Sequence, residues 1–244
     1  MSISYNQAWN DTRDLVRAHG SLVATVAGVF IFLPGLLVAY FLPQPHTDDI
    51  RQILPLISEY FSRNWPWLLL TYVLTMIGSI VILLLVFARD ISVGGAIAAS
   101  LAILPFYFLA SLLTGLILAP GFLLLVVPGL YLLGRLGPLG QVVVAENRRN
   151  PVDAIMRCLA LTRGNGWAIL GLILLVAVAA IVAIVVAVII VGILLVLLAG
   201  RDAAELPVLI LQTAGNTALR TLMLLLGAAI YRQLAGRDLG ATFE

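Results

Sequence analysis

The feature that constrains this chain most is the run from Trp167 to Ala199, which contains 33 residues and no charge. As a helix it would measure about 50 Å, whereas the hydrocarbon core of a bilayer is about 30 Å thick. Five further apolar runs are long enough to cross a bilayer, so the chain is predicted to fold inside a membrane. The six predicted spans cover residues 21–42, 65–88, 96–118, 120–145, 167–199 and 207–231.

The spans are predicted to be helices because backbone in lipid must satisfy its own hydrogen bonds, and no run shows the alternation of a barrel strand. Composition agrees, since 62% of residues are hydrophobic and only 11% are charged. The fold class is therefore an all-α polytopic membrane protein, with residues 1–244 forming a single integral membrane domain. A net charge of +2 is too small and too evenly spread to indicate nucleic acid, so no nucleic-acid partner is expected, and no cofactor is expected.

The distribution of arginines predicts the orientation of the spans. With the N-terminus inside, nine arginines lie on the cytoplasmic side and three on the outer side. Because positive charge concentrates in cytoplasmic loops, both termini are predicted to be cytoplasmic.

Amphipathic segments at 5–18, 47–62 and 151–163 are predicted to be interfacial helices. The third is the clearest, because Asn150 is placed to cap it and Pro151 suits the first helical position. Its arginines would reach lipid phosphates. The alternative is a connector packed on the protein itself. The residues predicted to lie at the membrane surface are Arg13, Arg17, Arg157, Arg163 and Trp167.

A short pattern recurs before three spans. "AIMRCLAL" from Ala154 matches "AIAASLAI" from Ala96, and Ala8 begins a looser match to the first. This recurrence suggests three copies of a unit with one interfacial helix and two spans. Chance similarity among Ala, Leu and Ile is the alternative.

Candidates for metal binding and catalysis are few. His46 lies close to Asp48 and Asp49, but helix capping by Thr47 and the two carboxylates explains that cluster more simply. No nucleophile–base pair or pair of carboxylates occurs at a plausible depth, so no metal site and no enzymatic activity are predicted.

The segment from "PGFLLLVVPGLYLLGRL" to "NPVDAIMRCLALTRGNGWAIL" resembles the bacterial glycerophosphoryl diester phosphodiesterase membrane-domain family and the related YciC-like proteins. The matching positions are Pro128, Gly129, Tyr131, Arg135, Glu146, Pro151, Ala154, Thr162, Arg163, Gly164 and Trp167. The resemblance covers about a quarter of the chain. It implies an inner-membrane protein with a role in envelope or lipid homeostasis, and it does not imply catalysis.

Arg135 and Arg220 are the two arginines inside predicted spans, and no span interior holds an acidic residue to pair with them. An unpaired arginine at mid-bilayer costs about 2.5–3.5 kcal/mol, so both require solvation. In one interpretation they are held inside the bundle by carbonyl groups of the broken helix around Gly137–Gly140 and by Gln212, Asn216 and Thr217, one turn from Arg220. In the other they line a polar cavity open to the cytoplasmic side and jointly bind an anionic group such as a lipid phosphate. The predicted ligand-binding residues are Tyr131, Arg135, Gln212, Asn216 and Arg220.

Two functions follow from these interpretations. The first is the handling or sensing of an anionic phospholipid or a similar amphiphilic anion. The second is a structural or assembly role, with a protein partner or a second copy of the chain and no ligand of its own.

Overall fold

The computed structural model describes residues 4–42, 49–88, 91–124 and 126–241. Within these ranges every regular element is a helix. Six helices are long and apolar enough to cross a membrane. The protein is therefore an all-α polytopic membrane protein, and this part of the sequence prediction is confirmed.

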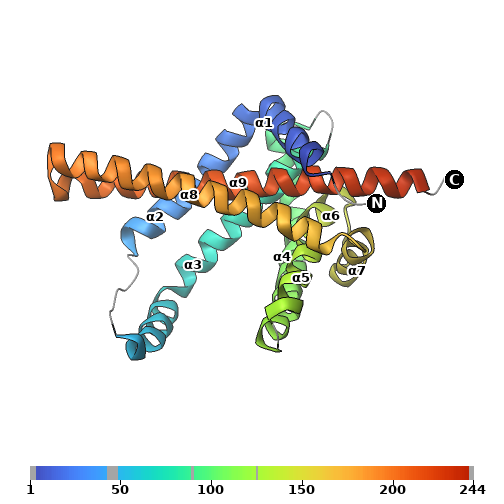
Figure 1. Cartoon of the computed structure of the whole chain (residues 1–244), viewed down its shortest axis with the longest axis horizontal. Coiled ribbons are helices and arrows are strands. Elements are labelled where there is room, and N and C mark those ends of the chain that lie inside the picture. The colour runs from blue at the N-terminus through green and yellow to red at the C-terminus, as the bar shows by residue number, and fades with distance from the viewer. Residues whose placement is uncertain (1–3, 43–48, 89–90, 125, 242–244) are drawn as a thin grey trace.

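The chain order of the elements can be followed in Figure 1. The elements are α1 (Tyr5–Ala27), a π-helical segment η1 (Gly28–Phe32), α2 (Leu33–Phe41), α3 (Ile50–Phe87), α4 (Val93–Leu124), α5 (Val126–Leu136), α6 (Leu139–Ala145), α7 (Pro151–Leu161), α8 (Gly166–Ala199) and α9 (Arg201–Ala241).

The buried core lies near one end of the molecule, and we call it the hub. It consists of residues 80–86 of α3, 141–144 of α6 and 225–230 of α9, with the inner face of α1 packed against them. Away from the hub, the α4–α5 hairpin and the α8–α9 hairpin extend in different directions (Figure 1). Beyond Val176 no described residue of α8 is buried.

Two predicted interfacial helices are not separate elements. Residues 5–18 are the first part of α1, which continues without a break to Ala27. Residues 50–62 are the first part of α3, which continues to Phe87, while residues 47 and 48 lie outside the described residues. In both helices the amphipathic pattern gives way to a uniformly apolar one. The backbone hydrogen bonds continue through this change of pattern, so neither helix ends there.

The predicted fourth span at 120–145 differs more. Helix α4 continues through Pro120 to Leu124, so the return begins with α5 at Val126. The span then breaks between Leu136 and Leu139, at the Gly137–Pro138 pair that the sequence indicates. A proline lacks the backbone N–H that would continue the helix, and it disfavours helical geometry at the residue before it.

The first membrane helix changes its hydrogen-bond pattern just before Pro34. The N–H of Leu33 bonds to the carbonyl of Gly28, an i→i−5 bond that widens the helix over η1. Pro34 removes the donor that an α-helix would need at this turn, and the π segment accommodates the loss.

The recurring pattern coincides with close packing. Its small residues at spacing four are each at most 1% exposed: Ala8 with Thr12, Ala96 with Ser100, and Ala154 with Cys158. Small side chains let helices approach closely, which is how helices associate in lipid. The three-unit repeat itself stays a prediction.

Helices α5 and α8 approach each other through two glycines. A Cβ atom at Gly134 would overlap the carbonyl oxygen of Gly166. We expect Gly134→Ala to lower the unfolding free energy by about 1–3 kcal/mol, the typical cost of overpacking. Gly115→Ala on α4 is the matched control, because a Cβ there meets nothing within 4 Å. Thermal unfolding in detergent measures both, and equal midpoints for the two variants would contradict the close approach.

Candidate functional site

Helix α6 carries the candidate site into the hub. Gln141, Val142, Val143 and Val144 are all buried. The Gln141 amide Nε2 donates to the carbonyl of Leu224 on α9, at 3.2 Å. Gly227 on α9 leaves room for this amide, because a Cβ there would overlap it. Helix α6 is thereby fixed on α9, and the residue after it, Glu146, is held beside α7.

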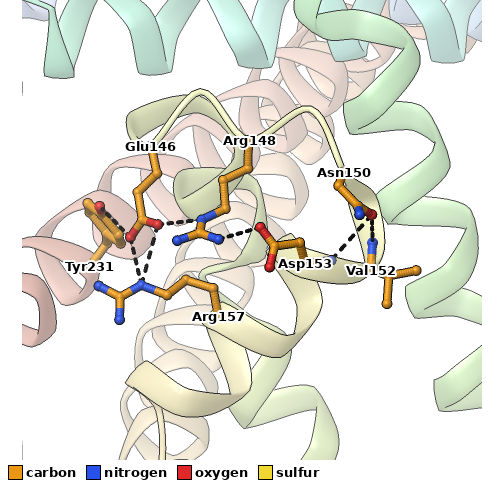
Figure 2. A network of polar contacts seen from close by, with 7 residues as sticks. All are labelled: Glu146, Arg148, Asn150, Val152, Asp153, Arg157 and Tyr231. Carbon is orange, nitrogen blue, oxygen red and sulfur yellow. Dashed lines mark hydrogen bonds and ion pairs between the residues drawn. The ribbon is translucent and has the colours of Figure 1, made fainter.

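Glu146 is the centre of a polar network at the α6–α7 junction (Figure 2). Its carboxylate accepts hydrogen bonds from Arg148 Nε at 2.6 Å, Arg157 Nε at 3.1 Å and the Tyr231 hydroxyl at 3.2 Å. Arg148 also pairs with Asp153 on α7. The Glu146 side chain is only 18% exposed. One carboxylate therefore joins the loop after α6 to both α7 and α9.

The hydrogen bond to Glu146 raises the pKa of Arg148 above its ordinary value, with a further contribution from Asp153. A carboxylate that accepts two guanidinium hydrogen bonds makes strong, charge-assisted contacts. These contacts hold α7 against the end of α6.

Helix α7 begins as the sequence predicts. The Asn150 side chain accepts from the N–H groups of Val152 and Asp153, and Pro151 takes the first turn. Ala154, Ile155 and Cys158 form its buried face. The cap and the apolar face thus fix both the start of α7 and its rotation about its axis.

Arg135 lies at the end of α5, beside the C-terminal turn of α7. Its Nη2 donates to the carbonyl of Leu159, and its guanidinium lies 5.8 Å from the centre of the Tyr131 ring. Leu159 is in the last turn of α7, where carbonyls lack helical donors and the helix dipole favours a cation. Arg135 is thus solvated by a carbonyl of α7, and the expected contact with carbonyls of Gly137–Gly140 is not the one that forms.

The predicted joint site of Arg135 and Arg220 stays a prediction, and the structure does not bring the two residues into contact. Arg135 packs on Gly166 at the start of α8, whereas Ile184 of α8 packs on Gly215 of α9. In an antiparallel hairpin with that register, Arg220 lies about 20 Å along α8 from Gly166. Depth along a span can be read from sequence, but which neighbour a residue faces cannot.

The amides predicted to support Arg220 do come together. Gln212 and Asn216 line one pocket of about 160 Å³ against Ile184 and Val188 of α8. Arg220 is one turn further along α9 and is exposed. Tyr131 lies apart from them, stacked on Trp167 with ring centres 5.6 Å apart.

Four of the five predicted surface residues are exposed: Arg13, Arg17, Arg163 and Trp167. Arg157 is the exception, because it pairs with Glu146 and is half-buried. Arg149, beside the α7 cap, is exposed as well. The charges at this junction thus divide into a paired set around Glu146 and an exposed set.

The structure shows two polar contacts near the site that sequence reasoning missed. One is the Glu146–Tyr231 pair, whose members are 85 residues apart. The other is Arg232, whose Nη2 donates to the carbonyl of Val86 at 2.7 Å and whose guanidinium lies 5.7 Å from the Phe87 ring centre. The sequence feature that could have indicated the first contact is the position of Glu146, directly after a predicted span and close to Arg148 and Arg149.

Metal binding has no candidate in the described part of the chain, where no three His, Cys, Asp or Glu residues gather. Of the cluster weighed from sequence, His46 and Asp48 lie outside the described residues. Asp49 caps α3 by accepting from the N–H of Arg51 at 2.9 Å.

No family model, curated protein or solved structure matches this chain. The family resemblance therefore stays a prediction, and function has to be argued from the site alone.

The Glu146–Arg157 ion pair predicts strong energetic coupling. We expect a double-mutant cycle of Glu146→Gln and Arg157→Gln to give a coupling energy of about 0.5–3 kcal/mol in detergent unfolding. The matched control pairs Glu146→Gln with Arg163→Gln, because Arg163 is exposed and has no bond to Glu146 among the described contacts. A coupling as large in the control cycle would mean that the ion pair is not the source.

Cys158 reports on the docking of α7. Its Sγ donates to the Arg135 carbonyl, and burial raises its pKa from 9.0 to about 12. Folding thus favours the neutral thiol, a stabilisation present below pH 9 and lost as the pH rises above it. We expect N-ethylmaleimide at pH 8 to leave Cys158 unmodified in the folded protein and to modify it fully in denaturant. Rapid labelling of folded protein would show that α7 is undocked.

Proposed function

We propose that this protein is a non-catalytic inner-membrane protein that binds anionic phospholipid at the surface of α7, as part of envelope homeostasis. The single observation that carries the proposal is the exposed face of α7. Val152 and Met156 are 58% and 64% exposed, and exposed Arg149 and Arg163 lie at the two ends of the helix. Apolar residues flanked by cations are typical of a helix at a membrane surface.

The surroundings of α7 support a membrane boundary at this level. Trp167 is 55% exposed and follows α7 at the start of α8. Tryptophan prefers the interface between hydrocarbon and water. Ala8 of α1 packs with Ile169 of α8 and Leu234 of α9. Both described chain ends therefore lie on the side of α7, and the arginine distribution places this side in the cytoplasm.

The exposed arginines are available to lipid because the other cations at the junction are already used. Arg135 donates to an α7 carbonyl, and Arg157 and Arg148 pair with Glu146. Arginine binds phosphate bidentately, so Arg149 and Arg163 suit the phosphate of a lipid headgroup.

We expect Arg149→Gln/Arg163→Gln to weaken binding of phosphatidylglycerol and leave binding of phosphatidylcholine unchanged. Each arginine near an anionic surface contributes about 1 kcal/mol, so the pair corresponds to roughly a thirtyfold loss. Lipid titration followed by native mass spectrometry measures this loss. The matched control is Arg51→Gln/Arg201→Gln. It removes one arginine from the first turn of α3 and one from the first turn of α9, at the helix ends away from the hub. An equal loss in the control would contradict a site on α7.

A second function, assembly with a protein partner or another copy of the chain, is favoured by α8. Its apolar run is longer than a bilayer requires, and its outer surface carries exposed residues such as Val182, Ile189 and Leu197. A helix of this length can tilt within the bilayer, and apolar surface that still projected from the hydrocarbon core would be covered by a protein partner. Retention of phosphatidylglycerol by a monomer would favour the first function, and a stable oligomer without lipid would favour the second.

A further inference from the structure

A pocket of about 190 Å³ lies between α4 and the α5–α6 segment. Three hydroxyl side chains of α4 line it, from Tyr107, Ser111 and Thr114. They are spaced by four and three residues, which places them on one face of the helix. Across the pocket lie apolar residues of the other segment and Gly140. The pocket is thus a polar stripe within an apolar span.

The hydroxyls differ in the hydrogen bonds they have left to make. Thr114 donates its proton to the carbonyl of Ala110 at 2.8 Å, so its oxygen remains only as an acceptor. Tyr107 and Ser111 have no hydrogen-bond partner within the described part of the chain. The pocket therefore offers two free O–H donors, from Tyr107 and Ser111, and the oxygen of Thr114 can act only as an acceptor.

The position of the pocket makes those free donors costly. Tyr107 is 14 residues from the start of α4 and Thr114 is 10 residues from its end, about 21 Å and 15 Å along the helix. The pocket therefore lies in the middle part of a spanning helix. A hydroxyl without a partner in hydrocarbon costs free energy, because lipid chains cannot hydrogen-bond. An occupant with polar groups removes that cost.

The backbone is shaped around the tyrosine. A Cβ at Gly140 would lie 2.6 Å from the Tyr107 hydroxyl oxygen, so only glycine leaves room for that oxygen. The described residues that line the pocket include no charged one. A charged headgroup would remain without a counter-charge at this depth, so the occupant is uncharged.

We propose that this pocket binds the glycerol part of a diacylglycerol. Such a lipid carries two ester carbonyls, which accept from Tyr107 and Ser111, and one free hydroxyl, which donates to Thr114. The volume corresponds to about six water molecules, enough for the glycerol part and too small for the acyl chains. The chains leave through the open side of the pocket into the bilayer. This site involves none of the arginines at α7, so it goes beyond anionic lipid binding.

The test removes the hydroxyl groups of Tyr107 and Ser111 and leaves the rest of each side chain in place. Purified protein in detergent is titrated with dioleoylglycerol, and the shift in unfolding midpoint gives the apparent affinity. We expect Tyr107→Phe/Ser111→Ala to bind about tenfold more weakly than wild type, as loss of two neutral hydrogen bonds predicts. The matched control is Tyr40→Phe on α2 combined with Ser79→Ala on α3, which removes the same atoms outside the pocket and is expected to bind like wild type.

The lipid is varied in the same way. The dialkyl ether analogue lacks both carbonyls, so we expect it to bind wild type as weakly as dioleoylglycerol binds the double variant. The 3-acetyl ester lacks the free hydroxyl, so Thr114→Val should weaken dioleoylglycerol binding and leave binding of this ester unchanged.

Three results would overturn the proposal: no midpoint shift of wild type with dioleoylglycerol, an equal shift in wild type and Tyr107→Phe/Ser111→Ala, or an equal loss in the Tyr40→Phe/Ser79→Ala control. The first would mean that water alone satisfies the hydroxyls. Arg149→Gln/Arg163→Gln separates this site from the proposed function, because it should lose the phosphatidylglycerol response and keep the dioleoylglycerol response. Failure of either response leaves the other interpretable.

Discussion

The structure depends on one constraint, that polar backbone groups at a helix end must find partners where water is scarce. Two arginines meet it in the same way. Arg135 donates to the carbonyl of Leu159 in the last turn of α7, and Arg232 donates to the carbonyl of Val86 in the last turn of α3. Arg135 also lies against the ring of Tyr131 on its own helix, α5. Arg232 also lies against the ring of Phe87 on the helix that it contacts, α3. A guanidinium suits this task because it carries several donors and its charge is favourable at the negative end of a helix. The two bonds tie α5 to α7 and α9 to α3.

The same constraint separates structural charges from functional ones. A charge that completes a helix end or a buried ion pair is not available to a ligand, and its removal leaves its partner unsatisfied. Glu146 and its partners belong to this class, since the carboxylate is mostly buried and joins three elements. Arg149 and Arg163 do not, because they are exposed at the ends of α7. An arginine inside a predicted span is therefore a weaker guide to a binding site here than an exposed arginine beside an amphipathic helix.

The limits of prediction follow from which interactions are local. Hydropathy finds the six spans, because each has to cross hydrocarbon by itself. Helix starts such as Asn150 and breaks such as Gly137–Pro138 are also local, and the structure has both. Register and rotation are not local. The contact between Glu146 and Tyr231 depends on how α6 docks on α9, and the offset of Arg220 from Gly166, about 20 Å along α8, depends on how α8 pairs with α9. Most side chains around α8 and the membrane part of α9 are apolar. Hydropathy therefore indicates neither the register nor the rotation of these helices.

Small residues explain why the helices meet at the hub and diverge elsewhere. Lipid chains are as apolar as leucine, so helices in a bilayer gain little from burying leucine against leucine. They gain from close contact, which requires residues without bulk. Such residues occur where the helices pack closely, in the buried pairs of the recurring pattern and in Gly134, which faces Gly166 across the α5–α8 contact. The outer half of α8 consists largely of Val, Ile and Leu, and there a single stripe contacts α9 while the rest stays exposed. The recurrence of alanine with a second small residue four positions later is thus required by packing at each site, whatever the origin of the three segments that carry it.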